Sequence, residues 1–153
     1  EDRVPNVVLM MDQLRIDEDN HHIELMKDGE GRFYAPAQDF NNIPYWNLVE
    51  GYLVRVDELV EASWRGEVIP ADTDIPLEAG WNLIAYLPTY ELDASAPNFP
   101  VLAPIIDNVL IAKDAHGRFM FPELNFSNMP PWRETQGYQV DVNEDVVLNY
   151  PDE

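Results

Sequence analysis

Apolar and polar side chains alternate along two stretches of the chain, residues 51–56 and 137–142. In the first stretch Tyr52, Val54 and Val56 fall at every second position, which places them on one face of an extended strand. The second stretch repeats this arrangement of one tyrosine and two valines. Each stretch is therefore predicted to form a strand with one face buried.

Four shorter stretches add further strands. Residues 60–64 and 146–150 alternate again and follow closely after the first pair, which predicts a second strand and a hairpin in each place. Residues 23–26 and 109–112 are also predicted to form strands, and residues 109–112 are apolar on both faces. A strand that is apolar on both faces is typical of the buried centre of a sheet.

Both of these last strands lead into the same turn signal. Asp28 and Asp114 each stand three residues before a glycine, Gly31 and Gly117. Asp at the first position and Gly at the fourth favour a type I turn closed by a left-handed residue, the usual three-residue hairpin loop. Basic residues flank both turns and are expected to pair with carboxylates, an anion site being the alternative: Lys27, Arg32, Lys113 and Arg118.

The two sets of signals belong to two copies of one unit. Residues 27–64 and 113–150 align without a gap at a spacing of 86, and 16 of the 38 aligned positions are identical. Agreement of this kind is the signature of an internal repeat. The sequence therefore predicts a tandem duplication.

Each copy also contains a proline-bearing loop and is preceded by a short helix. Residues 40–46 and 126–132 share a Pro-x-Trp ending, and proline favours a structured loop over a strand there. The apolar spacing in residues 7–14 and 101–109 fits one to three helical turns.

One predicted strand has no counterpart. Residues 75–88 form a turn and a Trp-bearing strand ahead of the second copy, whereas the equivalent segment of the first copy would precede residue 1. The chain is thus expected to begin inside a repeat. We expect an open sheet edge or groove near residues 1–30, where another chain could add a strand and cause self-association.

These elements predict a mainly β fold with two short helices, internally duplicated as a pseudo-twofold barrel or sandwich. The expected units are residues 1–70, which lack their first strand, and residues 71–153. Because a single copy is small, the two are expected to share one compact domain rather than fold as separate beads.

Charge narrows the range of partners. The chain carries 29 acidic and 9 basic residues, a formal net charge of -20, which disfavours nucleic acid and anionic membrane surfaces. Its apolar runs are too short for a membrane span. It contains no cysteine, which excludes disulfides, thiolate metal sites and a cysteine nucleophile.

The combination GWNLIAYLP, KDAHGRFMFPELNFSNMPPW and GYQVDVNEDVVLNYP carries a resemblance that covers nearly the whole chain. It resembles a repeat module found in the C-terminal regions of large secreted bacterial proteins. The resemblance implies an extracellular or cell-surface location and an accessory role. It implies no catalytic residues, and the missing first strand departs from its pattern.

The densest polar cluster is residues 17–22, in which Asp17, Asp19 and His21 are the candidate metal ligands. Oxygen ligands in a flexible loop suit calcium, and histidine suits a softer ion. The segment lacks the alternating ligands, central glycine and final glutamate of an EF-hand. A solvated acidic loop without a metal is the preferred interpretation, so no cofactor is expected and calcium is the alternative.

Aromatic residues offer a second candidate site. Trp46, Trp132 and Tyr45 lie in the proline-bearing loops, where exposed rings would stack on sugars. The tyrosines of the alternating strands are instead expected in the core.

No catalytic constellation is evident. His116 stands at a turn tip, and no serine lies in a nucleophile elbow. Unpaired carboxylates acting as a hydrolase are a remote alternative. The preferred function is a non-enzymatic structural or interaction module of a secreted or cell-surface bacterial protein, with a protein or glycan partner; a carbohydrate-binding module is the alternative.

Overall fold

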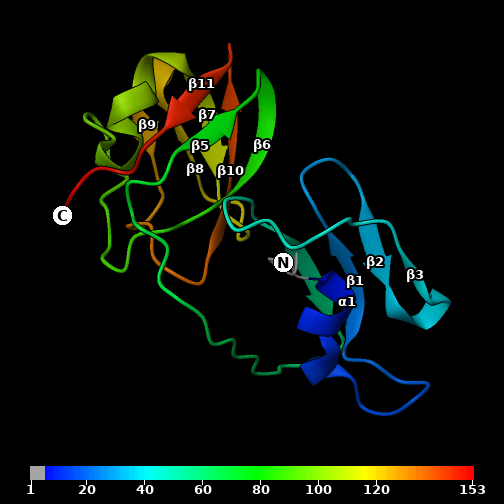
Figure 1. Ribbon diagram of the computed structural model, residues 1–153. Helices are drawn as coiled ribbons and strands as arrows, with labels where there is room; N and C mark the ends of the chain where they lie inside the picture. The colour runs from blue at the N-terminus through cyan, green and yellow to red at the C-terminus, as the bar shows by residue number, and fades with distance from the viewer. Residues whose placement is uncertain (1–5) are drawn as a thin grey trace. The chain divides into compact units, whose positions relative to one another are not determined.

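The computed structural model describes residues 6–153, and the chain divides into two compact units, Glu1–Glu67 and Val68–Glu153 (Figure 1). We call them unit 1 and unit 2 and describe each by itself. The boundary expected from the sequence was between residues 70 and 71. No helix in the described part of the chain is long and apolar enough to cross a membrane.

Unit 1 is a short helical entry followed by a four-stranded antiparallel sheet in the order β3-β2-β1-β4. The first helix begins at Asn6, whose side-chain Oδ1 accepts a hydrogen bond from Val8 N at 2.8 Å and so caps a free amide. The elements are α1 (Val7–Met10), η1 (Asp12–Leu14), β1 (Ile23–Lys27), β2 (Phe33–Ala35), η2 (Pro36–Gln38), β3 (Phe40–Asn41) and β4 (Leu53–Val56).

Unit 2 contains a five-stranded antiparallel sheet in the order β6-β10-β7-β8-β9 and a two-stranded sheet, β11-β5 (Figure 1). Its elements are β5 (Ile75–Leu77), β6 (Gly80–Ala85), η3 (Pro100–Asn108), β7 (Val109–Lys113), β8 (Phe119–Phe121), η4 (Pro122–Leu124), β9 (Phe126–Ser127), β10 (Gly137–Val142) and β11 (Val146–Leu148).

The spacing of 86 residues carries over from sequence to backbone. β1, β2 and β3 begin 86 residues before β7, β8 and β9, and η2 and η4 keep the same interval. Each of these short helices ends at a left-handed residue, Asp39 with φ 51° and Asn125 with φ 53°. The two units therefore follow the same local path through their hairpins and loops.

The predicted hairpin loop is confirmed in both units. Gly31 and Gly117 adopt φ values of 82° and 80°, the left-handed region that favours glycine. The carboxylate of Asp28 accepts hydrogen bonds from the main-chain N–H groups of Glu30 and Arg32, both at 2.9 Å, and pairs with the Arg32 guanidinium. The predicted pairing of these basic residues with carboxylates is thus confirmed for both arginines.

Unit 2 repeats this arrangement at Asp114 and Arg118, whose Oδ2 and Nε lie 2.7 Å apart. Burial alone would raise the pKa of the Asp114 carboxyl, but the hydrogen bonds from the Arg118 side chain and from the main chain outweigh it. The pKa of Asp114 is therefore lowered. Lys113 does something different, since its Nζ lies 4.7 Å from the centre of the Trp81 ring in a cation–π contact.

Each unit has its own buried apolar side chains. In unit 1 they come from the entry helices, β1, β2 and the following loop: Val7, Met11, Leu14, Ile23, Met26, Tyr34 and Ile43. In unit 2 the buried apolar side chains include Ile75, Ile84, Val101, Leu102, Ala112, Met120, Trp132, Val140 and Leu148.

The mainly β fold with short helices before the first strands is confirmed. The barrel or sandwich with one shared core stays a prediction. The predicted second hairpin is wrong, because β11 pairs with β5 and not with β10. Residues 60–64 form no strand, since unit 1 has no described counterpart of β5 for them to pair with.

Candidate interaction surface

Three aromatic rings of unit 1 gather beside β4. Trp46 and Tyr52 are stacked with their ring centres 4.7 Å apart, and Trp64 lies 6.0 Å from Trp46. The Trp64 Nε1 donates to the main-chain oxygen of Met10 at 2.8 Å, which fixes its indole against the entry helix. The Tyr52 hydroxyl accepts a hydrogen bond from Asn47 N at 2.7 Å. The group is therefore held in place from several sides.

Unit 2 builds the same group 86 residues later and then adds a fourth ring. Trp132 and Tyr138 stack at 3.9 Å with nearly parallel planes, and Tyr150 lies 6.4 Å from Trp132. Tyr86, which follows directly after β6, meets all three rings edge-on at 5.0–6.3 Å. Such edge-to-face contacts suit the charge distribution of aromatic rings.

The corresponding side chains differ sharply in exposure. Val140 is 0% exposed, whereas its counterpart Val54 is 45% exposed. Tyr150 is 3% exposed, whereas Trp64 is 46% exposed. We call this group the open face of unit 1. It consists of the exposed Val54, Val56 and Trp64 and the half-buried Trp46 and Tyr52.

The backbone beside this face is unpaired as well. In unit 2, β10 pairs with β7 on one side and with β6 on the other. In unit 1, β4 pairs with β1 alone among residues 6–153. β4 is therefore an open edge of unit 1, and it pairs directly with β1 at residues 23–27. The open edge or groove expected near residues 1–30 stays a prediction.

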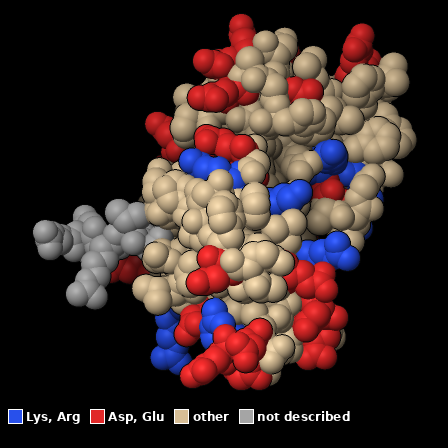
Figure 2. Space-filling view, turned by 90° about the vertical axis from the view of Figure 1, so that its right-hand side faces the viewer, with Lys and Arg blue, Asp and Glu red and all other residues tan. Residues whose placement is uncertain are grey.

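Charged groups flank the open face. Burial raises the pKa of Glu50, and the neighbouring carboxylates of Asp28 and Glu30 raise it further. Burial likewise raises the pKa of the Tyr52 hydroxyl. On the opposite face of the sheet, Arg55 pairs with Glu24 at 2.7 Å. Figure 2 shows acidic side chains in several separate groups over the visible surface, with Lys and Arg among them.

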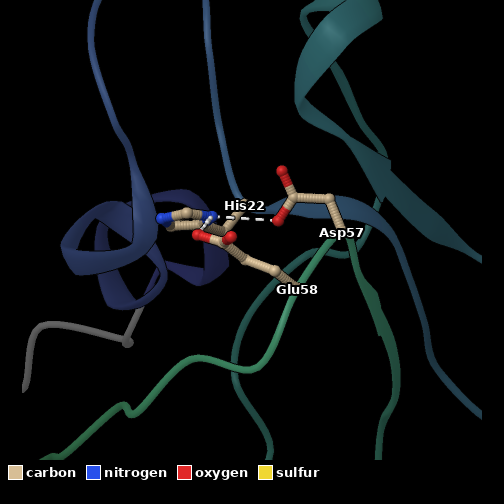
Figure 3. A group of neighbouring side chains, drawn as sticks. All are labelled: His22, Asp57 and Glu58. Atoms are coloured by element: carbon tan, nitrogen blue, oxygen red, sulfur yellow. Dashed lines mark hydrogen bonds and ion pairs between the residues drawn. The ribbon is translucent and has the colours of Figure 1, made fainter.

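A polar group of unit 1 brings His22 together with two carboxylates that follow β4. The His22 Nδ1 lies 2.9 Å from Asp57 Oδ1 and 3.6 Å from Glu58 Oε1 (Figure 3). One ligand atom from each residue lies within 4.8 Å of the others, a mixed nitrogen and oxygen set that suits borderline divalent metals. Unit 2 places Asn108, Asn143 and Glu144 at these positions, so the group is confined to unit 1.

The predicted metal ligands are not brought together in this way. Asp17 Oδ1 accepts hydrogen bonds from the main-chain N–H groups of Asp19 and Asn20, both at 2.9 Å, which closes a local turn. The pKa of Asp17 is lowered chiefly by a hydrogen bond from the Asn20 side chain, and the two main-chain bonds act in the same direction. His21 points elsewhere, with its Nδ1 accepting from Ile23 N at 3.0 Å. The Asp17 carboxylate thus stabilises the turn through local hydrogen bonds.

The three residues predicted to stack on sugars differ in their exposure. Tyr45 is 44% exposed and Trp46 is half-buried against Tyr52, but Trp132 is completely buried. Trp132 as a sugar platform is therefore corrected: it is part of the unit 2 core, where Tyr86 and Tyr138 cover it.

Sequence reasoning missed the His22 group and did not identify β4 as the open edge. The signal for the open face was available, because residues 75–88 had no counterpart. The signal for the His22 group was not, since Asp57 and Glu58 stand 35 or more residues away. Comparison with protein families, curated proteins and solved structures finds no match for this chain.

Proposed function

We propose that the chain is a non-enzymatic interaction module, made by tandem duplication and carried by a secreted or cell-surface bacterial protein. The observation that carries this proposal is the open face of unit 1. Its valines and tryptophan stand in solvent at positions where unit 2 buries the same or similar residues. A contiguous exposed apolar group beside an unpaired strand edge is typical of a binding surface.

The net negative charge of the chain favours some classes of partner over others. With a net charge of -20, long-range repulsion disfavours polyanions and favours neutral or basic partners. A carbohydrate ligand is the second candidate, supported by the exposed Tyr45 ring beside the half-buried Trp46. It would use unit 1 alone.

The test selects ligands that bind the wild-type chain but do not bind a variant with an altered open face. A displayed peptide library is selected on the wild-type chain and counter-selected on a double variant, Val54→Asp with Trp64→Ala. We expect enriched peptides that bind the wild type and lose binding to the double variant. A glycan array run in parallel on the same two proteins tests the second candidate.

Circular dichroism of the double variant serves as the folding control. If neither the library nor the array yields a ligand that distinguishes the two folded proteins, the interaction function is rejected. If the array alone yields one, the carbohydrate candidate replaces the peptide-binding interpretation.

A further inference from the structure

We infer that the open face of unit 1 binds a two-strand segment of another polypeptide, of the same chemistry as β5–β6, by strand addition to β4. The inference rests on the proposed function and names the partner class. The argument comes from unit 2, which contains both the equivalent face and the segment that covers it.

The first step is the edge. β6 runs antiparallel to β10 over six residue pairs, from Gly137 opposite Ala85 to Val142 opposite Gly80. The equivalent residues of unit 1 are 51–56, and only four of them are in strand conformation. A strand added there would supply the main-chain partners that β4 lacks on its outer side.

The second step is the side-chain fit. In β6, Ile84 stands opposite Tyr138 and is 2% exposed, and Tyr86 follows two positions later on the same face. On unit 1 the same register would place an apolar side chain against Tyr52. It would place an aromatic ring among Trp46, Tyr52 and Trp64, in the position that Tyr86 takes among its own three rings.

The third step extends the ligand from one strand to a segment with two strands. β5 pairs with β11, placing Leu77 opposite Val146 and Ile75 opposite Leu148. The unit 1 counterparts of those two β11 residues are Val60 and Ala62, in a segment without strand pairing. A segment with both strands would therefore pair its β6-like strand with β4 and its β5-like strand with residues 60–62.

The fourth step is the free energy. The two valines and the indole that would be covered are each more than a third exposed. Covering them removes apolar surface from water, which favours binding. Pairing along the edge adds main-chain hydrogen bonds and fixes the register.

The experiment titrates the full chain with a synthetic peptide of residues 75–88 by isothermal titration calorimetry. Hydrogen–deuterium exchange of the mixture locates the site. We expect one peptide per chain, with new protection at residues 53–56 and 60–62. Replacing Tyr86 by alanine in the peptide is expected to weaken binding about tenfold, because the ring contacts and the buried area are both lost.

Two matched controls test the predicted geometry. A peptide with Trp81→Ala changes the outward face of the strand, where in unit 2 the ring meets Lys113, the counterpart of Lys27. It is expected to weaken binding by no more than about fivefold, less than the Tyr86 change. In the protein, Val54→Asp is expected to weaken binding at least about tenfold. Leu53→Asp, which makes the same change on the opposite face of β4, is expected to leave it nearly unchanged.

Three results would overturn the inference. The first is no binding of the peptide by the folded chain. The second is protection at residues 137–142, which would mean exchange with β6. The third is a dimer of the free protein with residues 53–56 protected, which would make a second copy the occupant. If the peptide does not bind while the displayed library yields ligands for the open face, the interaction function stands and only the two-strand ligand is rejected.

Discussion

His21 shows how a single side chain is constrained by its surroundings. Its Nδ1 accepts the Ile23 N–H, and its ring meets Tyr34 edge-on at 6.0 Å. Partial burial lowers the pKa of His21, and the charge of Arg15 acts in the same direction while Asp12 opposes it. The neutral ring is therefore part of the folded state of unit 1.

This pKa direction sets the pH dependence of unit 1. Because the folded-state pKa lies below the ordinary value of about 6.5, the unfolded state binds more protons under mildly acidic conditions. We expect the stability due to His21 to be complete above pH ~6.5 and to fall as the pH drops towards the folded-state pKa. His21→Asn keeps an acceptor for Ile23 N and should reduce this loss.

The measurement is the free energy of unfolding of unit 1, from hydrogen exchange of the β1 amides corrected for intrinsic rates, at two pH values on either side of 6. His116→Asn, at an exposed hairpin tip, is the control. An unchanged pH slope in His21→Asn would show that His21 does not set it.

At the scale of elements, the same motif ends in two different environments. Trp46 and Trp132 both stand two residues after a proline and stack on a tyrosine of the following strand. Only Trp132 also meets Tyr86 edge-on and pairs its main chain with Leu92, from segments without a described counterpart in unit 1. The difference comes from neighbouring elements and not from the motif.

We therefore expect unequal costs for one substitution. Trp132→Ala should destabilise unit 2 by about 3–5 kcal/mol, the usual loss for a large buried aromatic side chain. Trp46→Ala should cost unit 1 about 1–2 kcal/mol, because the ring is half-buried. Urea unfolding combined with hydrogen exchange of β10 and β4 would separate the two values. Equal losses would contradict the different burial of the two rings.

At the scale of the whole molecule, charge is the dominant property. A net charge of -20 on 153 residues makes mutual repulsion among carboxylates a general cost of folding. Among residues 6–153 only a few carboxylates are offset by local ion pairs, such as those of the two hairpin turns. The remaining repulsion acts over distances that salt screens.

Thermal stability at neutral pH should therefore rise with ionic strength. We expect the melting temperature to increase by roughly 2–5 °C between about 0.02 and 0.2 M NaCl, because the screening length falls to below about 10 Å. The control is the same salt series near pH 4.1, the isoelectric point, where net repulsion is small. A melting temperature independent of salt at pH 7 would show that repulsion does not limit stability.

The parts of this structure that were predicted from sequence are local. The hairpin loops at Asp28–Gly31 and Asp114–Gly117 were predictable because the aspartate and the left-handed glycine lie within four residues of each other. The mainly β character and the short helices before β1 and β7 follow from periodicity in single segments. Such signals depend only on backbone preference and side-chain spacing.

The tertiary structure decided what is far apart in the chain. The pairing of β11 with β5, the burial of Trp132 and the meeting of His22 with Asp57 each join segments separated by 35 or more residues. Periodicity gives a strand its two faces but does not name its neighbours. For β4 and β10 the sequence determined nearly the same strand and the same apolar face, and that face is buried only in β10, which has β6 beside it.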